Sequence, residues 1–168
     1  MGDFDHSEES TQNELSKAIK GYQDYSIPEQ RDKTDQNLRN FLKTKLDFIN
    51  QLLPEIQKRT QQLFGHNVVD AFKRVDSGVK LLLEPLQNPC YSDQPFFKKA
   101  NLRPENLTQL YDHDFQLKEQ VEILEDEFKQ LETIKDESEL LEILNHLYDL
   151  TDGLNQTLTE REFLFMGD

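Results

Sequence analysis

Apolar residues recur at every third or fourth position through most of the chain, and this spacing is typical of amphipathic α-helices. The strongest stripe runs through residues 34–64. Its positions are Leu46, Ile49, Leu53, Ile56, Thr60 and Leu63, and it is widened by Phe41, Leu42, Phe48 and Phe64. Pro54 interrupts the stripe, and proline removes a backbone donor and collides with the preceding turn. We therefore expect a helix that is kinked or split at Pro54 and that ends at Gly65.

Two shorter stripes flank this segment. Residues 11–25 predict a helix with one apolar face, made of Leu15, Ala18, Ile19 and Tyr22. Residues 67–84 predict another, with Val68, Phe72, Val75, Val79 and Leu82. Gly78 either weakens that helix by about 1 kcal/mol relative to alanine or lets a neighbouring helix approach closely. Residues 1–10 are acidic and polar, so we expect a disordered tail ahead of an N-terminal helical segment, residues 11–84.

A cluster of prolines separates the two halves of the chain. Pro85, Pro89, Pro95 and Pro104 fall within twenty residues, which predicts a proline-rich connection over residues 85–103. A loop of this length within a domain is uncommon and is often functional or a hinge. Phe96 and Phe97 in this connection either plug the base of a bundle or contact a partner.

The last third of the chain predicts two further helices with a short polar turn between them. Residues 104–134 carry a seam of Leu117, Val121, Leu124, Phe128 and Leu131. Residues 139–165 carry a second seam of Leu140, Leu144, Leu147, Thr151, Leu154 and Leu158. No strand-like alternation is present along the chain. The predicted fold class is therefore all-α: a kinked helical bundle followed by an antiparallel helical hairpin or coiled-coil arm, residues 104–168.

Charge separates the two halves as well. The net charge of −14 lies in residues 105–168, which hold 18 acidic and 4 basic residues, whereas residues 1–103 hold 15 of each. An acidic amphipathic hairpin is typical of a docking surface for a partner protein. Residues 31–104 hold 13 basic and 8 acidic residues, a surplus that pairing with an acidic neighbour explains. We expect no direct binding to nucleic acid.

The residues that usually carry chemistry do not form a recognisable site. Glu142 and His146 are four positions apart, whereas di-iron bundles use a spacing of three. A calcium loop with Gly153 at its sixth position would need carboxylates where the chain has other side chains. Cys90 is the single cysteine, so it can form neither an internal disulfide nor a structural zinc site. The expectation is a protein without catalytic residues, cofactor or metal, in a reducing compartment, cytoplasmic or nuclear, with no signal peptide and no membrane span.

Partner contacts are expected at the apolar seams of the hairpin and at the apolar end of the chain. The predicted partner-binding residues are Leu117, Val121, Leu124, Phe128, Leu131, Leu144, Leu147, Leu154, Leu158, Phe163 and Phe165. The partners would be other helical proteins, including a basic one, or a second copy of the chain.

Two functional hypotheses follow from these features. The first is a non-enzymatic coiled-coil subunit or adaptor of a multiprotein assembly, a scaffold or tether of, for example, the cytoskeletal or kinetochore type. The alternative is a stand-alone regulatory binding module, such as a chaperone, an inhibitor or an acidic decoy. A subunit would be poorly folded or self-associated on its own, whereas a module would be compact and stable. An enzyme is disfavoured because the only polar residues read on the seams are Thr60 and Thr151, which are neither acids nor bases.

Overall fold

A computed structural model describes residues 3–91 and 103–166 of the chain. These residues form five α-helices: α1 (Asp3–Ala18), α2 (Pro28–Phe64), α3 (Val69–Gln87), α4 (Pro104–Gln130) and α5 (Glu137–Met166). Two short 3₁₀ helices, η1 (Gly65–Val68) and η3 (Leu131–Thr133), lie in the α2–α3 and α4–α5 connections. No strand occurs within the described ranges. The all-α class is confirmed.

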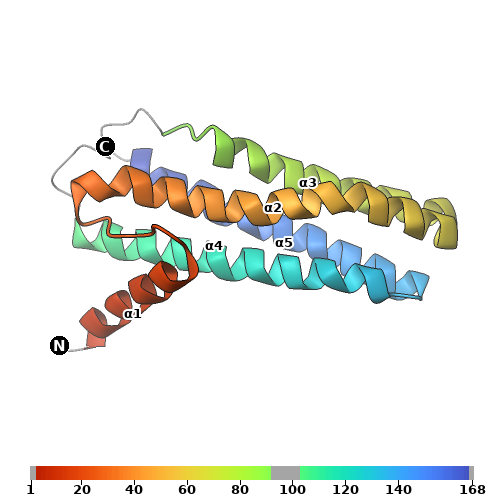
Figure 1. The fold of residues 1–168 in the computed structure, drawn as a ribbon, viewed down its shortest axis with the longest axis horizontal. Helices are drawn as coiled ribbons and strands as arrows, with labels where there is room; N and C mark the ends of the chain where they lie inside the picture. The colour runs from red at the N-terminus through yellow and green to blue at the C-terminus, as the bar shows by residue number, and fades with distance from the viewer. Residues whose placement is uncertain (1–2, 92–102, 167–168) are drawn as a thin grey trace.

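Helices α2 to α5 pack side by side along their lengths (Figure 1). Helix α2 contacts α3 and α4, and α5 contacts the same two helices from the other side. Figure 1 shows that α2 and α4 run in one direction and α3 and α5 return, so each of these pairs is parallel. The hairpin of α4 and α5 therefore belongs to one bundle with α2 and α3, and the sequence-based expectation of a separate arm is wrong. Four apolar stripes on one chain can cover one another, which leaves none for an arm.

The core follows most positions of the predicted stripes, but Leu63, predicted on the stripe of α2, is 73% exposed. Among the residues that the structure describes, thirty-two apolar ones are buried, and they form one continuous cluster. Gly65 ends α2 as expected, with a φ of 77°. Gly78 allows a close helix approach, because a Cβ built on it would lie 2.3 Å from Oγ1 of Thr151 on α5. That contact brings α3 against α5.

Several element boundaries differ from the sequence expectations. Helix α2 is unbroken through Pro54, so the split is wrong: Pro54 lies on the exposed side, while Leu53 and Ile56 beside it are buried in the same core. Helix α3 continues through Pro85 to Gln87, three residues beyond the predicted end. This extension buries Leu86 in the core. Residues 92–102 of the predicted connection, with Phe96 and Phe97, lie outside the described residues.

The N-terminal helix also differs. Residues 3–10, expected to be a disordered tail, belong to α1, which ends at Ala18 rather than Tyr25. Lys17 in the last turn of α1 suits the helix dipole. The chain then turns at Gly21, whose φ of 82° favours glycine. Asn37 on α2 donates a hydrogen bond to the Gly21 carbonyl at 2.9 Å, which fixes the turn against the bundle.

Among the described helices, none combines the length and the apolar character that a bilayer crossing requires.

Candidate functional site: a buried polar cluster and the α2–α4 groove

Ten of the eleven predicted partner-binding residues lie inside the chain's own core. Their exposed fractions are between 0% and 7%. They are Leu117, Val121, Leu124, Phe128, Leu131, Leu144, Leu147, Leu154, Leu158 and Phe165. Only Phe163 is at the surface, with 69% of its area exposed. The seams of α4 and α5 are thus covered by α2, by α3 and by one another. Their role in partner binding stays a prediction, and it requires the bundle to open.

The C-terminal end of α5 is divided between core and surface. Phe165 stacks on Tyr91 with ring centroids 4.4 Å apart and also lies 4.8 Å from the guanidinium carbon of Arg161. This contact attaches the end of α5 to the segment that follows α3. Phe163, two residues earlier, faces away from this contact and is exposed.

Arg161 itself lies at the centre of a buried polar cluster near this end of the bundle. Its side chain is 1% exposed, and it forms ion pairs with Asp114 at 2.6 Å and Asp35 at 2.7 Å. Both aspartates are also fully buried, at 0% and 1% exposure. Buried charges are stable only when they are paired and hydrogen-bonded.

Three tyrosines and Arg39 complete the hydrogen bonding of the two carboxylates, and Arg39 pairs with Oδ2 of Asp35 at 2.9 Å. Tyr22 and Tyr25 donate hydrogen bonds to Oδ2 of Asp114 at 2.8 and 2.7 Å. Tyr91 donates to Oδ1 of Asp35 at 2.8 Å and accepts from the guanidinium at 2.9 Å. The guanidinium also donates to the Tyr25 hydroxyl at 3.0 Å. The cluster therefore joins the N-terminal turn, α2, the segment after α3, α4 and α5.

Protonation within the buried polar cluster follows from burial and charge. Burial raises the pKa of all three tyrosines, and the neighbouring carboxylates add to this rise. Burial alone lowers the pKa of Arg161, but Asp114 and the surrounding oxygens raise it well above the ordinary arginine value. The tyrosines thus remain neutral donors and the arginine remains charged. This arrangement has the geometry of a structural ion-pair network, since its groups are engaged with one another.

The sequence analysis missed this cluster, although a signal was present. Arg161 continues the spacing of Leu154 and Leu158, and Asp114 precedes Leu117 by three positions on the seam of α4. Reading only Thr60 and Thr151 as polar seam residues was therefore wrong. Charged residues in the phase of an apolar stripe indicate buried ion pairs, and the long stem of arginine suits such a position.

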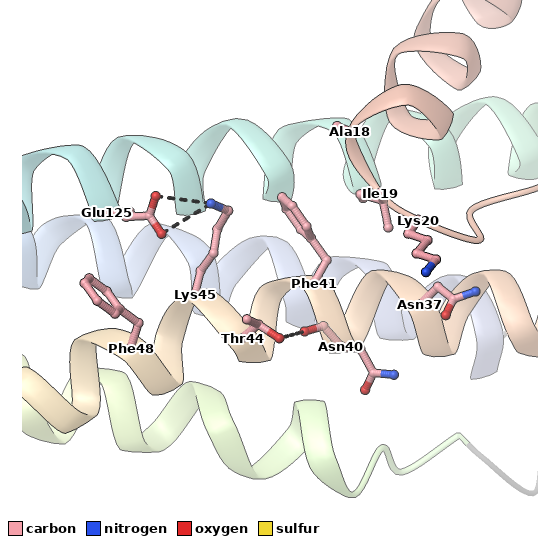
Figure 2. A pocket seen from close by; sticks show the side chains of 10 residues that line it. All are labelled: Ala18, Ile19, Lys20, Asn37, Asn40, Phe41, Thr44, Lys45, Phe48 and Glu125. Atoms are coloured by element: carbon pink, nitrogen blue, oxygen red, sulfur yellow. Dashed lines mark hydrogen bonds and ion pairs between the residues drawn. The ribbon is translucent and has the colours of Figure 1, made fainter.

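A groove lies between α2 and α4 and is bounded at one end by the C-terminal turn of α1 (Figure 2). Its volume is about 630 Å³. The lining residues are Ala18, Ile19, Lys20, Asn37, Asn40, Phe41, Thr44, Lys45, Phe48 and Glu125. Phe41 points toward α4, and Lys45 reaches across to Glu125 at 3.2 Å (Figure 2).

A second hollow continues the groove along the same two helices. It has a volume of about 100 Å³ and is lined by Phe48, Leu52, Ile56, Phe128, Lys129 and Glu132. Because Phe48 lines both hollows and is 41% exposed, we treat them as one surface, the α2–α4 groove. Arg59 and Glu132 form an exposed ion pair of 3.4 Å at its far end.

The remaining candidate chemistry is sparse. No group of three or more potential metal ligands occurs among the residues with described positions. Burial and the nearby Glu162 raise the pKa of Cys90, which disfavours the reactive thiolate form. Glu142 and His146, weighed for a metal site, lie on α5, where His146 pairs with Glu127 at 2.5 Å.

The described residues define an all-α protein in which α2 to α5 form one bundle, α1 contacts α4, and a polar cluster is buried near one end. Comparison with known proteins adds no relative to this description: no protein-family model matches the chain, and neither a curated protein nor a solved structure matches it significantly.

Proposed function

We propose that this protein is a non-enzymatic helical binding module, which holds itself together through its seams and contacts a helical partner through the α2–α4 groove. The observation that carries the proposal is the contrast between the two kinds of apolar surface. The seams of α4 and α5 are covered by the chain itself, whereas Phe48 in the groove is 41% exposed.

Free energies favour the groove over the seams as the contact surface. Exposing one buried side chain such as Leu124 or Phe128 costs roughly 1.5–3 kcal/mol. Opening the hairpin would expose ten predicted contact residues, at a cost that exceeds the typical total stability of about 5–15 kcal/mol. A partner that contacts the groove requires no such opening.

This reasoning favours the stand-alone module over the assembly subunit that cannot fold alone. The acidic half of the chain supports a basic partner, because complementary charge raises the rate of encounter. The subunit hypothesis retains one supporting observation, the exposure of Phe163 at the end of α5. An adaptor that folds stably on its own and also contacts a partner through the end of α5 is compatible with both the module and the subunit hypothesis.

Two measurements test the proposed function. Sedimentation and urea unfolding of the purified chain should show a folded species with one cooperative transition. Tagged wild-type protein, Phe48→Ser and Leu81→Ser should then be compared in pull-downs from cell extract. Leu81 is 61% exposed but lies on α3, outside the groove, so Leu81→Ser is the matched control.

Loss of specific partners only in Phe48→Ser is the expected result. A chain that folds only after a partner is added would contradict the module and restore the subunit hypothesis. Identical partners for all three proteins would show that the groove is not the contact surface.

A further inference from the structure

The floor of the α2–α4 groove has the spacing of a surface that receives a helix. Phe41, Phe48, Leu52 and Ile56 follow one another along α2 at steps of seven, four and four. From Phe41 to Ile56 this row spans about 22 Å, or roughly four helical turns. Partner helices bind such grooves through apolar residues at positions i, i+3, i+4 and i+7.

The charges beside this floor have a consistent order. Two ion pairs cross the groove, Lys45 to Glu125 and Arg59 to Glu132. In both the base comes from α2, and the acid comes from α4 or from η3, which directly follows it. Lys129 is a base on the α4 side, and it is paired with Glu125 at 3.4 Å. The α2 rim is thus basic and the α4 rim acidic.

We propose that the groove takes an amphipathic α-helix of a partner protein whose apolar stripe is flanked by acidic residues on one side and basic residues on the other. The acidic flank lies along α2, beside Lys45 and Arg59, and the basic flank lies along α4, beside Glu125 and Glu132. This inference rests on the proposed function and adds the chemistry of the partner and its direction of binding.

The direction follows from geometry. Turning a helix end for end in the groove, with its apolar face still toward the floor, exchanges its two flanks. Only one direction then places acids along α2 and bases along α4. A uniformly basic helix is attracted by the net charge of −14, but it places like charges against the α2 rim.

Two synthetic peptides of about 18 residues, sufficient to cover the floor, test the inference. Both carry the same leucine stripe and the same numbers of Glu and Lys, and their charged flanks are exchanged. Each has a photo-crosslinker at its N-terminus, and fluorescence anisotropy gives its affinity. We expect both peptides to bind, with crosslinks near Lys20 for one peptide and near Glu132 for the other.

A charge-exchanged variant supplies the decisive comparison. Lys45→Glu with Glu125→Lys and Arg59→Glu with Glu132→Arg reverse the rims while keeping the two ion pairs that cross the groove; Lys129→Glu is added to keep the pair with position 125. Circular dichroism confirms its fold. The crosslinked ends should exchange between the two peptides, and unchanged ends, or both directions for each peptide, overturn the inference. If this variant does not fold, the exchange of Lys45 and Glu125 alone should weaken the directional preference of each peptide, and an unweakened preference overturns the inference.

Phe48→Ser separates the failure of this inference from that of the proposed function. We expect it to weaken both peptides about tenfold or more, the effect of losing one partly buried aromatic contact, while Leu81→Ser leaves them unchanged. If Phe48→Ser weakens binding but the ends do not exchange, only the charge order is wrong. If neither peptide binds, or Phe48→Ser has no effect, the groove is not a helix site and both proposals fail.

Discussion

Replacing Arg161 with methionine tests whether the buried polar cluster holds the end of the bundle together. Methionine keeps much of the apolar stem but removes the charge that lies 2.6 Å from Asp114 and 2.7 Å from Asp35. Asp114 then remains buried without a counter-charge, whereas Asp35 keeps its ion pair with Arg39 at 2.9 Å. Removing one partner of a buried ion pair costs about 3–5 kcal/mol, which is a large share of a typical stability of about 5–15 kcal/mol.

Urea unfolding followed by circular dichroism measures this loss. With an m value of about 2 kcal/mol per molar, the midpoint should fall by roughly 2 M. Arg59→Met is the matched control, because Arg59 and Glu132 are 55% and 54% exposed, and such pairs contribute at most about 1 kcal/mol. A midpoint for Arg161→Met that equals that of Arg59→Met would refute the structural role of the cluster.

A second readout separates charge from packing. Burial already raises the pKa of Asp114 against the opposing effect of Arg161. Without the guanidinium, a neutral Asp114 is less costly to bury than a charged one. The difference in stability between wild type and Arg161→Met should therefore narrow as the pH falls from about 7 toward the ordinary aspartate pKa of about 4. A difference that is constant with pH would assign the loss to packing.

Three further predictions concern protonation and close contacts. The three cluster tyrosines have raised pKa values in the folded state, so the native state holds protons that the unfolded chain releases above about pH 10. The free energy of unfolding should therefore fall by up to about 4 kcal/mol per pH unit above that point. Urea unfolding at several alkaline pH values measures this fall. Gly78→Ala should destabilise the fold by about 1–3 kcal/mol, because its Cβ would lie 2.3 Å from Thr151. Gly153→Ala should instead stabilise the fold by up to about 1 kcal/mol, because the nearest neighbour of its Cβ is 3.7 Å away. The melting temperatures of the two variants give the sign of each effect. Gly21→Ala should also destabilise by at least about 1 kcal/mol, since its φ is 82° and its Cβ would contact Asn37, and a melting temperature equal to that of wild type would contradict this.

Much of the fold could be predicted from the sequence because helix period and core burial are local and directly linked. Leu124 and Leu154, read as seam positions, are buried at 1% and 2%. What covers a stripe is not local, which is why the hairpin was expected to stand apart. The packing of α5 against α3 includes a close contact between Gly78 and Thr151, which are 73 residues apart in the sequence. A single sequence does not indicate which helix will pack closely against a glycine.

The candidate site was harder to predict for a related physical reason. A seam residue and an exposed groove residue are both apolar and share the helical period, so spacing alone does not separate them. On α2 the distinction lies partly in width: Leu46 and Ile49 are 1% and 0% exposed, whereas Phe48, which widens the stripe, remains 41% exposed. Leu42 also widens the stripe but is buried, and Leu63 follows the spacing of the stripe but is 73% exposed. An apolar stripe wider than the two neighbouring helices can cover leaves part of itself in water. Exposure in the folded bundle, rather than position in the stripe, therefore decides which apolar residues can contact a partner.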